Sequence, residues 1–397
     1  MRGAVTASLM RSINRSAVLE LIRLEGPISR TQIARRLDMS LPTVMRIVDG
    51  LLAEDLVREA GAGKSTGGRP SPLLELNSDG FVVLGVDLGG TKLYGTVADL
   101  AGNIQFSLYR PHQNHAAQNG GDYLDELCRF IDELLAAPRP PGQRVRGIGV
   151  GAPGITSAPD GVVRWAPSLG WRDLPLQAIL AERFSLPVTV ENDVNLAAMG
   201  EWGFGAGQGA GSLVLLAVGT GIGAGVVING ALHRGANQAA GEVGYMLPGI
   251  DALDRRYEGF GALEQLASGT GIAERAKAAL KVAGKPVSPN LDAHAVFAAA
   301  REGQEWATRI VDETVDYLSL AIANISVVLD PEVVVVGGGV ASSADLLIEP
   351  VKRRLAGVIP YPPRIVASQL GRDAAVMGAI MRVMKVTDEH FVVTRIR

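Results

Sequence analysis

Two glycine-rich turns of the same kind, far apart in the chain, place the strongest limit on the fold. In the first, an apolar run leads into Gly85–Lys92 (GVDLGGTK), and the apolar stretch Leu93–Leu100 follows. In the second, Leu213–Val218 leads into Gly219–Gly225 (GTGIGAG), and another apolar stretch follows. Each turn joins two predicted strands. The body is therefore expected to be a duplicated, two-lobed α/β fold of the actin-like ATPase (ribonuclease H-like) kind, which binds nucleotide between its lobes.

The first turn has the chemistry of a phosphate site. The preceding strand delivers Asp87 to its end, Gly89 and Gly90 let the backbone approach a phosphate, Thr91 offers a hydroxyl and Lys92 adds positive charge. The spacing differs from that of a Walker A loop. A Gly-Gly pair after a strand is also common in plain hairpins, so both interpretations stay open at this point.

Two later glycine clusters extend this pattern. Gly219, Thr220 and Gly221 repeat the strand–turn–strand arrangement of the first turn. Gly338 and Gly339 follow another predicted strand, where a nucleobase or ribose can lie against bare backbone. These five residues are predicted to bind the nucleotide.

The segment Glu191–Asn195 (ENDVN) follows a short predicted strand and precedes a helix. Asn and Asp at the carboxyl end of a strand are well placed to hold a polyol, with Asp193 as the base and Asn192 as a hydroxyl ligand. Helix N-caps also favour Asn and Asp, which is a competing explanation for one of the two. Capping alone poorly explains four polar residues in five positions.

A strand ending near Val150 leads into Gly151–Gly154 (GAPG) and then a long segment rich in Trp and Pro. We interpret this region as a sugar-facing lid, with Gly154 at the sugar. An ordinary loop is the alternative.

Composition limits the class of protein. A chain of 397 residues is long enough for two or three domains, and 47% hydrophobic with 20% charged residues is typical of a well-packed globular protein. The single cysteine, Cys128, excludes an internal disulfide and a cysteine zinc cluster, and it fits a reducing cytosol. Neither a signal peptide nor a membrane span is evident, so a cytoplasmic protein without a membrane partner is expected.

The N-terminal region differs from the body in charge. Residues 1–71 hold eleven Arg or Lys against seven Asp or Glu, a net charge of +4, whereas the whole chain has −3. A basic head on an acidic body indicates a polyanionic partner for the head alone.

The apolar spacing in this head predicts a helix-turn-helix. A first helix, with Ile13, Ala17, Val18, Leu21, Ile22 and Leu24 on its apolar face, ends near Gly26. Ser29–Gln32 has the form of a capping box that opens a second helix, and Ser40 is placed to cap a third. That third helix buries one stripe and leaves Pro42, Thr43 and Arg46 on the other, so these three and Ser40 are predicted to contact DNA. A three-helix packing module with a solvated face is the alternative.

The next segment favours DNA binding. Two predicted strands, near residues 56–59 and 73–76, flank the loop GAGKSTGGRPSP, which carries Lys64 and Arg69. This is the layout of a winged helix-turn-helix whose basic wing lies on phosphates or in a minor groove. A plain glycine-rich linker is the alternative.

Taken in order, the motifs DLGGTK, GAPG, ENDVN, GTGIGAG, GEVGY and VVVVGGG resemble those of the ROK family of repressors and sugar kinases, over roughly residues 80–385. The winged head with Gly68-Arg69-Pro70 resembles that of the family's repressors, which the free-standing kinases lack. The resemblance implies that Gly89, Thr91, Lys92, Gly219, Thr220 and Gly339 face ATP. It also implies that Asn192, Asp193, Glu242 and Glu264 face the sugar.

One departure from the family pattern concerns zinc. Tyr245 stands where family members carry a zinc-binding histidine, and Arg255, Tyr257 and Ala262 stand where they carry cysteines. A site without thiolate or imidazole cannot hold tetrahedral zinc. We therefore predict no metal site here, with Tyr245 instead offering a hydroxyl to the sugar.

Together these patterns predict a winged helix-turn-helix at 1–78, a small lobe at 79–194 completed by a C-terminal helix at about 380–397, and a large lobe at 195–380. The predicted function is a sugar-responsive repressor that binds operator DNA as a homodimer or homotetramer and is released by a sugar or sugar phosphate. Because the phosphate turn and Asp193 are retained, a sugar kinase that uses ATP and Mg²⁺, with Asp193 as catalytic base, is the second interpretation. A protein-binding module is the third.

Overall fold

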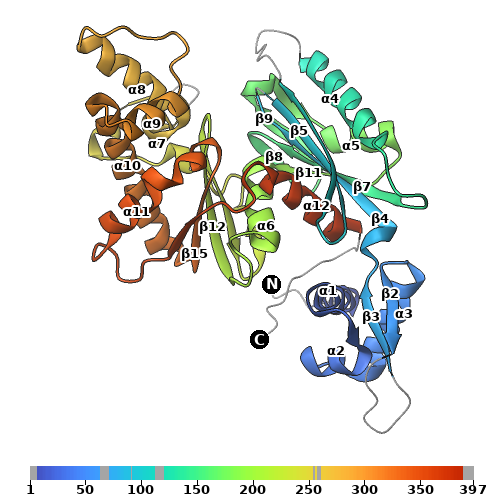
Figure 1. The fold of residues 1–397 in the computed structure, drawn as a ribbon. Helices are drawn as coiled ribbons and strands as arrows, with labels where there is room; N and C mark the ends of the chain where they lie inside the picture. The colour runs from blue at the N-terminus through green and yellow to red at the C-terminus, as the bar shows by residue number, and fades with distance from the viewer. Residues whose placement is uncertain are drawn as a thin grey trace. The chain divides into compact units, whose positions relative to one another are not determined.

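The computed structural model describes residues 7–62, 71–90, 92–111, 120–253, 255–256 and 261–387, which Figure 1 shows as a ribbon. The chain divides into two units. The first holds Met1–Leu196, Asn229–Ala231 and Ala375–Arg397, and the second holds Ala197–Ile228 and Leu232–Ala374. Four residues singled out in the sequence, Lys64, Arg69, Thr91 and Tyr257, lie outside the described residues.

The head in the first unit is a winged helix-turn-helix. Its three helices are α1 (Ala7–Glu25), α2 (Arg30–Arg36) and α3 (Leu41–Ala53). A small antiparallel sheet of order β1-β3-β2 accompanies them, built from β1 (Ile28–Ser29), β2 (Val57–Ala62) and β3 (Pro72–Leu76). The predicted helices and both predicted strands are thus confirmed, while the wing loop lies mostly outside the described residues.

The caps of these helices are those that the sequence predicts. The Ser29 hydroxyl accepts from the Gln32 backbone N–H and the Gln32 side chain accepts from the Ser29 N–H, which completes the capping box. Asp38, with φ 50°, provides the left-handed turn that separates α2 from α3. Ser40 then caps α3 by accepting from the Thr43 N–H at 3.4 Å.

The head buries its own small core, with Val44, Val48 and Leu51 fully buried on one face of α3. On α1, the placement of Leu24 in the core is wrong, since this side chain is 57% exposed. All residues from Leu24 to Pro27 are exposed, so the last turn of α1 projects past the surface that packs on α3 and β3.

A five-stranded sheet of order β11-β7-β4-β5-β6 forms the lobe of the first unit. Its strands are β4 (Phe81–Leu88), β5 (Lys92–Asp99), β6 (Ile104–Pro111), β7 (Arg144–Ala152) and β11 (Val188–Asn192). The helices of this lobe are α4 (Gly120–Leu135), α5 (Leu176–Phe184) and α12 (Ala374–Thr387), and a short 3₁₀ turn, η1 (Ser78–Gly80), precedes β4.

Alternate residues of the central strand face the two sides of this sheet. Val82, Leu84 and Val86 join a core shared with α4 and α5. On the other side a Cβ at Gly85 would lie 2.5 Å from the Val376 carbonyl oxygen of α12. The backbone of α12 thus approaches the sheet too closely for any residue but glycine.

The Trp- and Pro-containing segment after Gly154 is not a loop. It forms an antiparallel sheet of order β10-β9-β8, made of β8 (Ile155–Ser157), β9 (Val162–Ala166) and β10 (Trp171–Leu174), with η2 (Pro167–Leu169) between the last two strands. Val163, Ala166, Leu169 and Trp171 are buried in the core of the lobe. The segment is therefore anchored by packing along most of its length.

The second unit has a five-stranded sheet of order β14-β13-β12-β15-β16. Its strands are β12 (Ser212–Val218), β13 (Ile222–Ile228), β14 (Ala231–His233), β15 (Val333–Gly337) and β16 (Arg364–Ala367). Its helices are α7 (Ala262–Ala267), α8 (Gly269–Val282), α9 (Ala293–Arg301), α10 (Glu305–Leu329) and α11 (Ala344–Leu355), with short turns η3 (Val243–Tyr245), η4 (Ile250–Ala252), η5 (Gly339–Ser343) and η6 (Gly371–Asp373). Helix α6 (Asp193–Phe204) begins in the first unit and continues in the second.

The two sheets have the same topology, which confirms the predicted duplication. If the strands of each sheet are numbered by their order in the chain, their spatial order is 3-2-1-4-5 in both sheets, starting from β6 in the first and from β14 in the second. In each, the first two strands form an antiparallel hairpin, and the first and fourth pair in parallel. The two glycine-rich turns join the hairpin strands.

Among the described residues, no helix is both long and apolar enough to span a bilayer.

Candidate functional site

The first glycine turn places a buried acid beside a lysine. Asp87, near the end of β4, is 8% exposed, and its Oδ2 lies 3.6 Å from Nζ of Lys92. Burial raises the pKa of Asp87, and the neighbouring ammonium partly opposes this. The Gly89 N–H donates to the Lys92 carbonyl at 2.8 Å, which closes the turn. The turn therefore presents one cation and glycine backbone beside a carboxylate.

Tyr123 of α4, which the sequence analysis did not identify, supports this turn from behind. Its hydroxyl donates to the Gly89 carbonyl at 3.0 Å, and its ring meets Trp171 edge-to-face, with centroids 5.4 Å apart. Burial, and then the charges of Glu126 and Asp87, raise the pKa of the phenol, so it stays a donor. In the sequence Tyr123 reads only as one apolar residue of an amphipathic helix.

The polar segment after β11 lies at the same sheet edge as Asp87. In the strand ladders Asp87 pairs with Gly151, and Gly151 pairs with Glu191. A Cβ at Gly151 would lie 3.3 Å from Cα of Asp193. The carboxyl ends of three neighbouring strands thus bring Asp87 and Asp193 to either side of Gly151, at the edge where open α/β sheets bind ligands.

Hydrogen bonds fix the residues at this corner. Asn192 Nδ2 donates to the Gly154 carbonyl at 3.0 Å and to Asp193 Oδ1 at 3.1 Å, and Asn192 Oδ1 accepts from the Asn195 N–H at 2.9 Å. Asn192 therefore has the capping role that was the competing explanation, while it also ties Gly154 to the corner. Glu191, 1% exposed, accepts from the Asn192 N–H at 3.1 Å and braces the corner from inside.

Gly154 is needed as a glycine. Its φ is +81°, and a Cβ there would lie 2.1 Å from the Trp165 carbonyl oxygen. Only glycine lets β9 come this close to the turn, which in turn brings the Gly154 carbonyl to Asn192.

In the second unit, the glycine turn between β12 and β13 is held by its neighbours. The Gly219 carbonyl accepts from the Gly269 N–H at 2.7 Å, and the Thr220 carbonyl accepts from the Thr270 hydroxyl at 3.0 Å. Gly338, with φ +81°, lies against Val218 at the end of β12, where a Cβ would come within 2.4 Å of the Val218 carbonyl oxygen. The predicted nucleotide-binding residues of this unit, 219–221 and 338–339, thus lie at one edge of one sheet.

An acidic pair lies next to this second turn. Glu264 of α7 accepts from the Ile222 N–H at 2.8 Å through Oε2, the atom that a Cβ at Gly221 would approach to 2.8 Å. Burial raises the pKa of Glu264. Partial desolvation, and then the charge of Glu264, raise the pKa of Glu242, although that residue stays exposed overall, so little free energy is involved.

Tyr245, 50% exposed, belongs to the same cluster. Its pKa is raised first by partial desolvation and then by the charges of Glu242 and Glu264. Two carboxylates and a phenol thus gather where sugar hydroxyls can donate to the acids and accept from the tyrosine.

Changing Glu264 to glutamine tests the electrostatics of this pair. A raised pKa means that the folded chain prefers the neutral acid. The contribution of Glu264 to the free energy of unfolding therefore increases as pH falls from neutral towards the usual Glu range, and decreases as pH rises again. Glutamine keeps an acceptor for Ile222 and removes the charge. We expect the unliganded variant to melt no lower than the wild type at pH 7, with a weaker dependence of Tm on pH.

The matched control for this test is Glu302→Gln, at an exposed position of the same unit, which should leave both quantities unchanged. Sugar-induced stabilisation should shrink in Glu264→Gln alone. A variant that melts clearly lower at pH 7, with the pH dependence of the wild type, contradicts this account of Glu264.

The segment that replaces the zinc site of the ROK pattern is described in part. Arg255 is exposed and Ala262 is buried at the start of α7, while Tyr257 lies outside the described residues. Within the ranges that the structure covers, no three His, Cys, Asp or Glu side chains are grouped to hold a metal ion.

In the head, α3 presents the residues predicted to contact DNA. Pro42 and Arg46 are exposed, and Thr43 is half-buried. Ser40 caps α3 and its hydroxyl lies 2.8 Å from that of Thr43, so both hydroxyls lie at the helix N-terminus, where phosphates bind readily. Asp49, on the same stripe, forms its ion pair with Arg30 at 3.5 Å. The first two turns of α3 therefore offer hydroxyls and one guanidinium to a groove.

Comparison with known proteins identifies both parts of the chain. Residues 83–386 match the ROK family, and residues 11–58 match the winged helix-turn-helix DNA-binding family. A xylose repressor of Caldicellulosiruptor bescii is 32% identical over 392 residues, which cover 95% of this chain and 96% of the repressor.

A glucokinase of Halalkalibacterium halodurans is 35% identical over 311 residues, which cover 74% of this chain and 92% of the kinase. Among solved structures, a ROK family transcriptional regulator described as a homolog of the E. coli MLC protein superposes with a TM-score of 0.81 at 25% identity. That match covers 96% of this chain and 97% of the regulator.

Proposed function

The chain belongs to the ROK family, and from this we propose that it is a transcriptional repressor that binds operator DNA through its head and releases it when its body binds a sugar or sugar phosphate. The observation that carries the proposal is that one chain contains both a DNA-binding head and a sugar-kinase-like body. A winged helix-turn-helix with an exposed Arg46 precedes a complete sugar-kinase-like body.

The lengths of the matches support the repressor over the kinase. The xylose repressor matches this chain over nearly its whole length, whereas the glucokinase matches about three quarters of it. A kinase has no need of a DNA-reading helix. The operator contacts that we propose are Ser40, Pro42, Thr43, Arg46, Lys64 and Arg69.

The effector contacts that we propose are six residues. Gly154, Asn192 and Asp193 belong to the first unit, and Glu242, Tyr245 and Glu264 to the second. All offer donors or acceptors of the kind that sugar hydroxyls need. The names of the relatives make xylose and glucose the first sugars to test.

The experiment that tests this function compares the full chain with a chain lacking residues 1–78, on DNA from the upstream intergenic region of its own gene. We expect the full chain to bind at physiological salt and the shortened chain to show no specific binding. Equal binding by both would show that the head is not the DNA-binding part.

A sugar kinase is the second candidate, because the phosphate turn is intact. Asp87, Gly89, Gly90 and Lys92 keep a buried acid, a cation and open backbone at the sheet edge shared with Asp193, and Thr91 completes the motif. These residues fit a phosphate, with Gly219, Thr220, Gly221, Gly338 and Gly339 on the second unit for the nucleotide. Mg-ATP, when bound, supplies the phosphoryl group, and Asp193 would accept the proton of the sugar hydroxyl. A coupled assay for ADP, run over a panel of sugars, decides whether the protein phosphorylates any of them.

We further propose that the chain binds no structural zinc, because Tyr245, Arg255, Tyr257 and Ala262 offer neither thiolate nor imidazole. Metal analysis of dialysed protein should find far less than one zinc per chain, and a chelator should leave the melting temperature unchanged. About one zinc per chain, with unfolding on chelation, would overturn this assignment.

The domain limits that we propose are a head at 1–78, a small lobe at 79–194 completed by the C-terminal helix, and a large lobe at 195–380. The protein acts in the cytoplasm, where its operator is, and as a homodimer or homotetramer. A single helix-turn-helix reads only a few base pairs, and two-fold repressors read half-sites about one helical turn, or a multiple of it, apart.

A further inference from the structure

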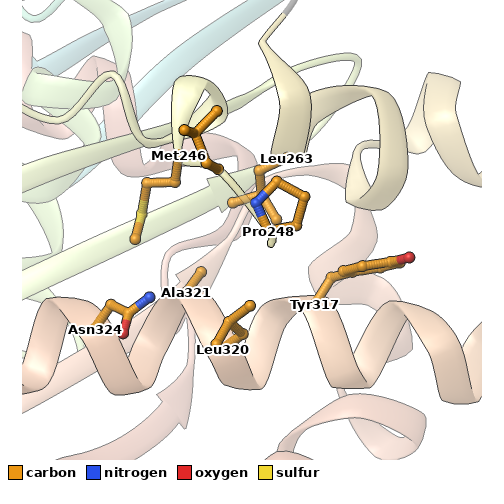
Figure 2. Close-up of a pocket in the computed structure, with 8 residues that line it drawn as sticks. Met246, Pro248, Leu263, Tyr317, Leu320, Ala321 and Asn324 are labelled. Atoms are coloured by element: carbon orange, nitrogen blue, oxygen red, sulfur yellow. The ribbon is translucent and has the colours of Figure 1, made fainter. Parts of the chain in front are cut away.

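The exposed apolar side chains of α3 have different neighbours from those of the second unit. Figure 2 shows a pocket of the second unit that Met246 and Leu320 help to line, and none of the residues lining it is charged. On α3, Leu41 is 39% exposed and Met45 is 46% exposed, and the adjacent Arg46 is exposed as well. Apolar side chains that share a surface with a guanidinium suit a partner that offers both negative charge and apolar groups.

The two apolar side chains belong to the exposed stripe of α3. Leu41, Met45 and Asp49 follow one another at the i+4 spacing of one helix face. Pro42 and Arg46 lie beside them at the same spacing. The opposite stripe of the helix is buried in the core of the head, so the exposed stripe is available to a partner.

The charges around this stripe favour a polyanion as that partner. Asp49 is the one acid in α3, and it pairs with Arg30 of α2 at 3.5 Å. Its charge is therefore partly neutralised by a neighbour within the head. Because residues 1–71 carry a net charge of +4, the field of the head attracts DNA to this surface.

Only one exposed side chain in this part of α3 can donate a hydrogen bond to a base. The N-terminal residues of a recognition helix are those that contact base edges. The exposed side chains in the first two turns of α3 are Leu41, Pro42, Met45 and Arg46. Of these, only Arg46 carries a hydrogen-bond donor. The other three distinguish bases by apolar contact.

The major groove offers one apolar group for such a contact, the C5 methyl group of thymine. We propose that Leu41 and Met45 bind thymine methyl groups, so that each operator half-site carries thymines next to the base pair read by Arg46. This inference rests on the proposed repressor function and adds the bases that the recognition helix selects.

The geometry of the helix allows the two side chains to contact separate base pairs. Residues four apart are about 6 Å apart along a helix axis, whereas successive base pairs of DNA are about 3.4 Å apart. Met45 has an unbranched, polarisable side chain that adapts its shape to a methyl group. Leu41, one turn earlier, offers a second apolar contact to a neighbouring step.

The test uses DNA from the upstream intergenic region of the chain's own gene, amplified once with dTTP and once with dUTP. Uracil pairs as thymine does and lacks only the methyl group, so the two fragments have the same sequence and charge. Burial of one methyl group changes affinity about fourfold, or about 0.8 kcal/mol. A dimer that makes two such contacts in each half-site should therefore bind the thymine fragment on the order of 100-fold more tightly at fixed salt, as measured by fluorescence anisotropy.

Substitutions on α3 identify the side chains that read the methyl groups. Met45→Ala removes half of the contacts, so its preference for the thymine fragment should fall to about tenfold. Leu41→Ala combined with Met45→Ala should nearly abolish the preference. The matched control is Leu24→Ala on α1 of the same head, where the replaced side chain is 57% exposed and the preference should stay at the wild-type value. An unchanged melting temperature shows that the variants fold.

Two results overturn this inference and leave the repressor function standing. One is a wild type that binds the thymine and uracil fragments equally tightly, and above unrelated DNA. The other is a preference for thymine that the double variant keeps in full, since the methyl groups then act through the shape of the DNA or on another side chain. A chain that binds neither fragment above unrelated DNA overturns the proposed function, and this inference with it.

Discussion

Changing Asp193 to asparagine is expected to weaken sugar binding moderately and to leave operator release intact at higher sugar concentration. Asp193 opens α6 at the sheet edge shared with Asp87 and bonds through Oδ1 to the Val194 N–H at 2.9 Å and to Asn192 Nδ2 at 3.1 Å. Asparagine keeps the shape and one acceptor but loses the negative charge. The loss should not exceed one or two charge-assisted hydrogen bonds, about 1.5–3 kcal/mol each.

The same variant has a far larger effect if the chain is a kinase. A carboxylate that accepts the hydroxyl proton during phosphoryl transfer cannot be replaced by an amide. Turnover should then fall by about 10²–10⁴-fold, even at saturating sugar. The two functions thus separate in one variant, because saturation restores a sensor and does not restore a lost base.

The measurements are sugar affinity by titration calorimetry, operator release by fluorescence anisotropy, and ADP production. Asp125→Asn, at an exposed position on α4 of the same unit, is the control for a lost carboxylate. Sugar phosphorylation by the wild type that Asp193→Asn abolishes would reverse the order of our two candidate functions.

Replacing Arg46 with alanine should relax operator specificity by about 1–3 kcal/mol, because an arginine that reads a guanine edge discriminates by that amount. Arg46 is exposed on α3, and Ser40 caps the same helix at its N-terminus, with its hydroxyl 2.8 Å from that of Thr43. Affinity for the operator should fall towards that for unrelated DNA. Competition titrations with operator and unrelated DNA measure the ratio of the two affinities directly.

Lys64→Ala should behave differently, since a phosphate contact carries no sequence information. It should weaken operator and unrelated DNA alike and lower the salt slope by about one. Arg309→Ala, which removes one charge from the body, should change neither quantity. If Arg46→Ala lowers affinity for every sequence equally, Arg46 contacts only the backbone.

The sequence predicted those parts of the fold that depend on local pattern. Apolar periodicity and caps placed α1 to α3, and strand–glycine–strand repeats predicted both hairpins and their duplication. The error at Leu24 arose because periodicity says which residues share a face and cannot say where the packed surface ends. The strands after Gly154 were not predicted because they are only three to five residues long and are separated by turns, and the interpretation of this segment as a sugar-facing lid stays a prediction.

The candidate site was predictable where one motif supplies all the groups. Asp87 and Lys92 are five residues apart, and Asn192 and Asp193 are adjacent. The support from Tyr123 to Gly89 was missed, because a hydrogen bond between residues 34 positions apart leaves no local pattern. The contact of Glu264 with the Ile222 N–H was missed for the same reason.

The most direct test of the repressor account is one anisotropy titration of the full chain on labelled upstream DNA, run at fixed salt with and without each sugar of a thermal-shift panel. A sugar that binds the folded protein raises its melting temperature by an amount that depends on its affinity and concentration. The same sugar should also release the DNA, over a similar range of sugar concentration. Specific binding that one such sugar reverses is the predicted result. DNA binding that no stabilising sugar alters, or no specific binding at all, contradicts the account.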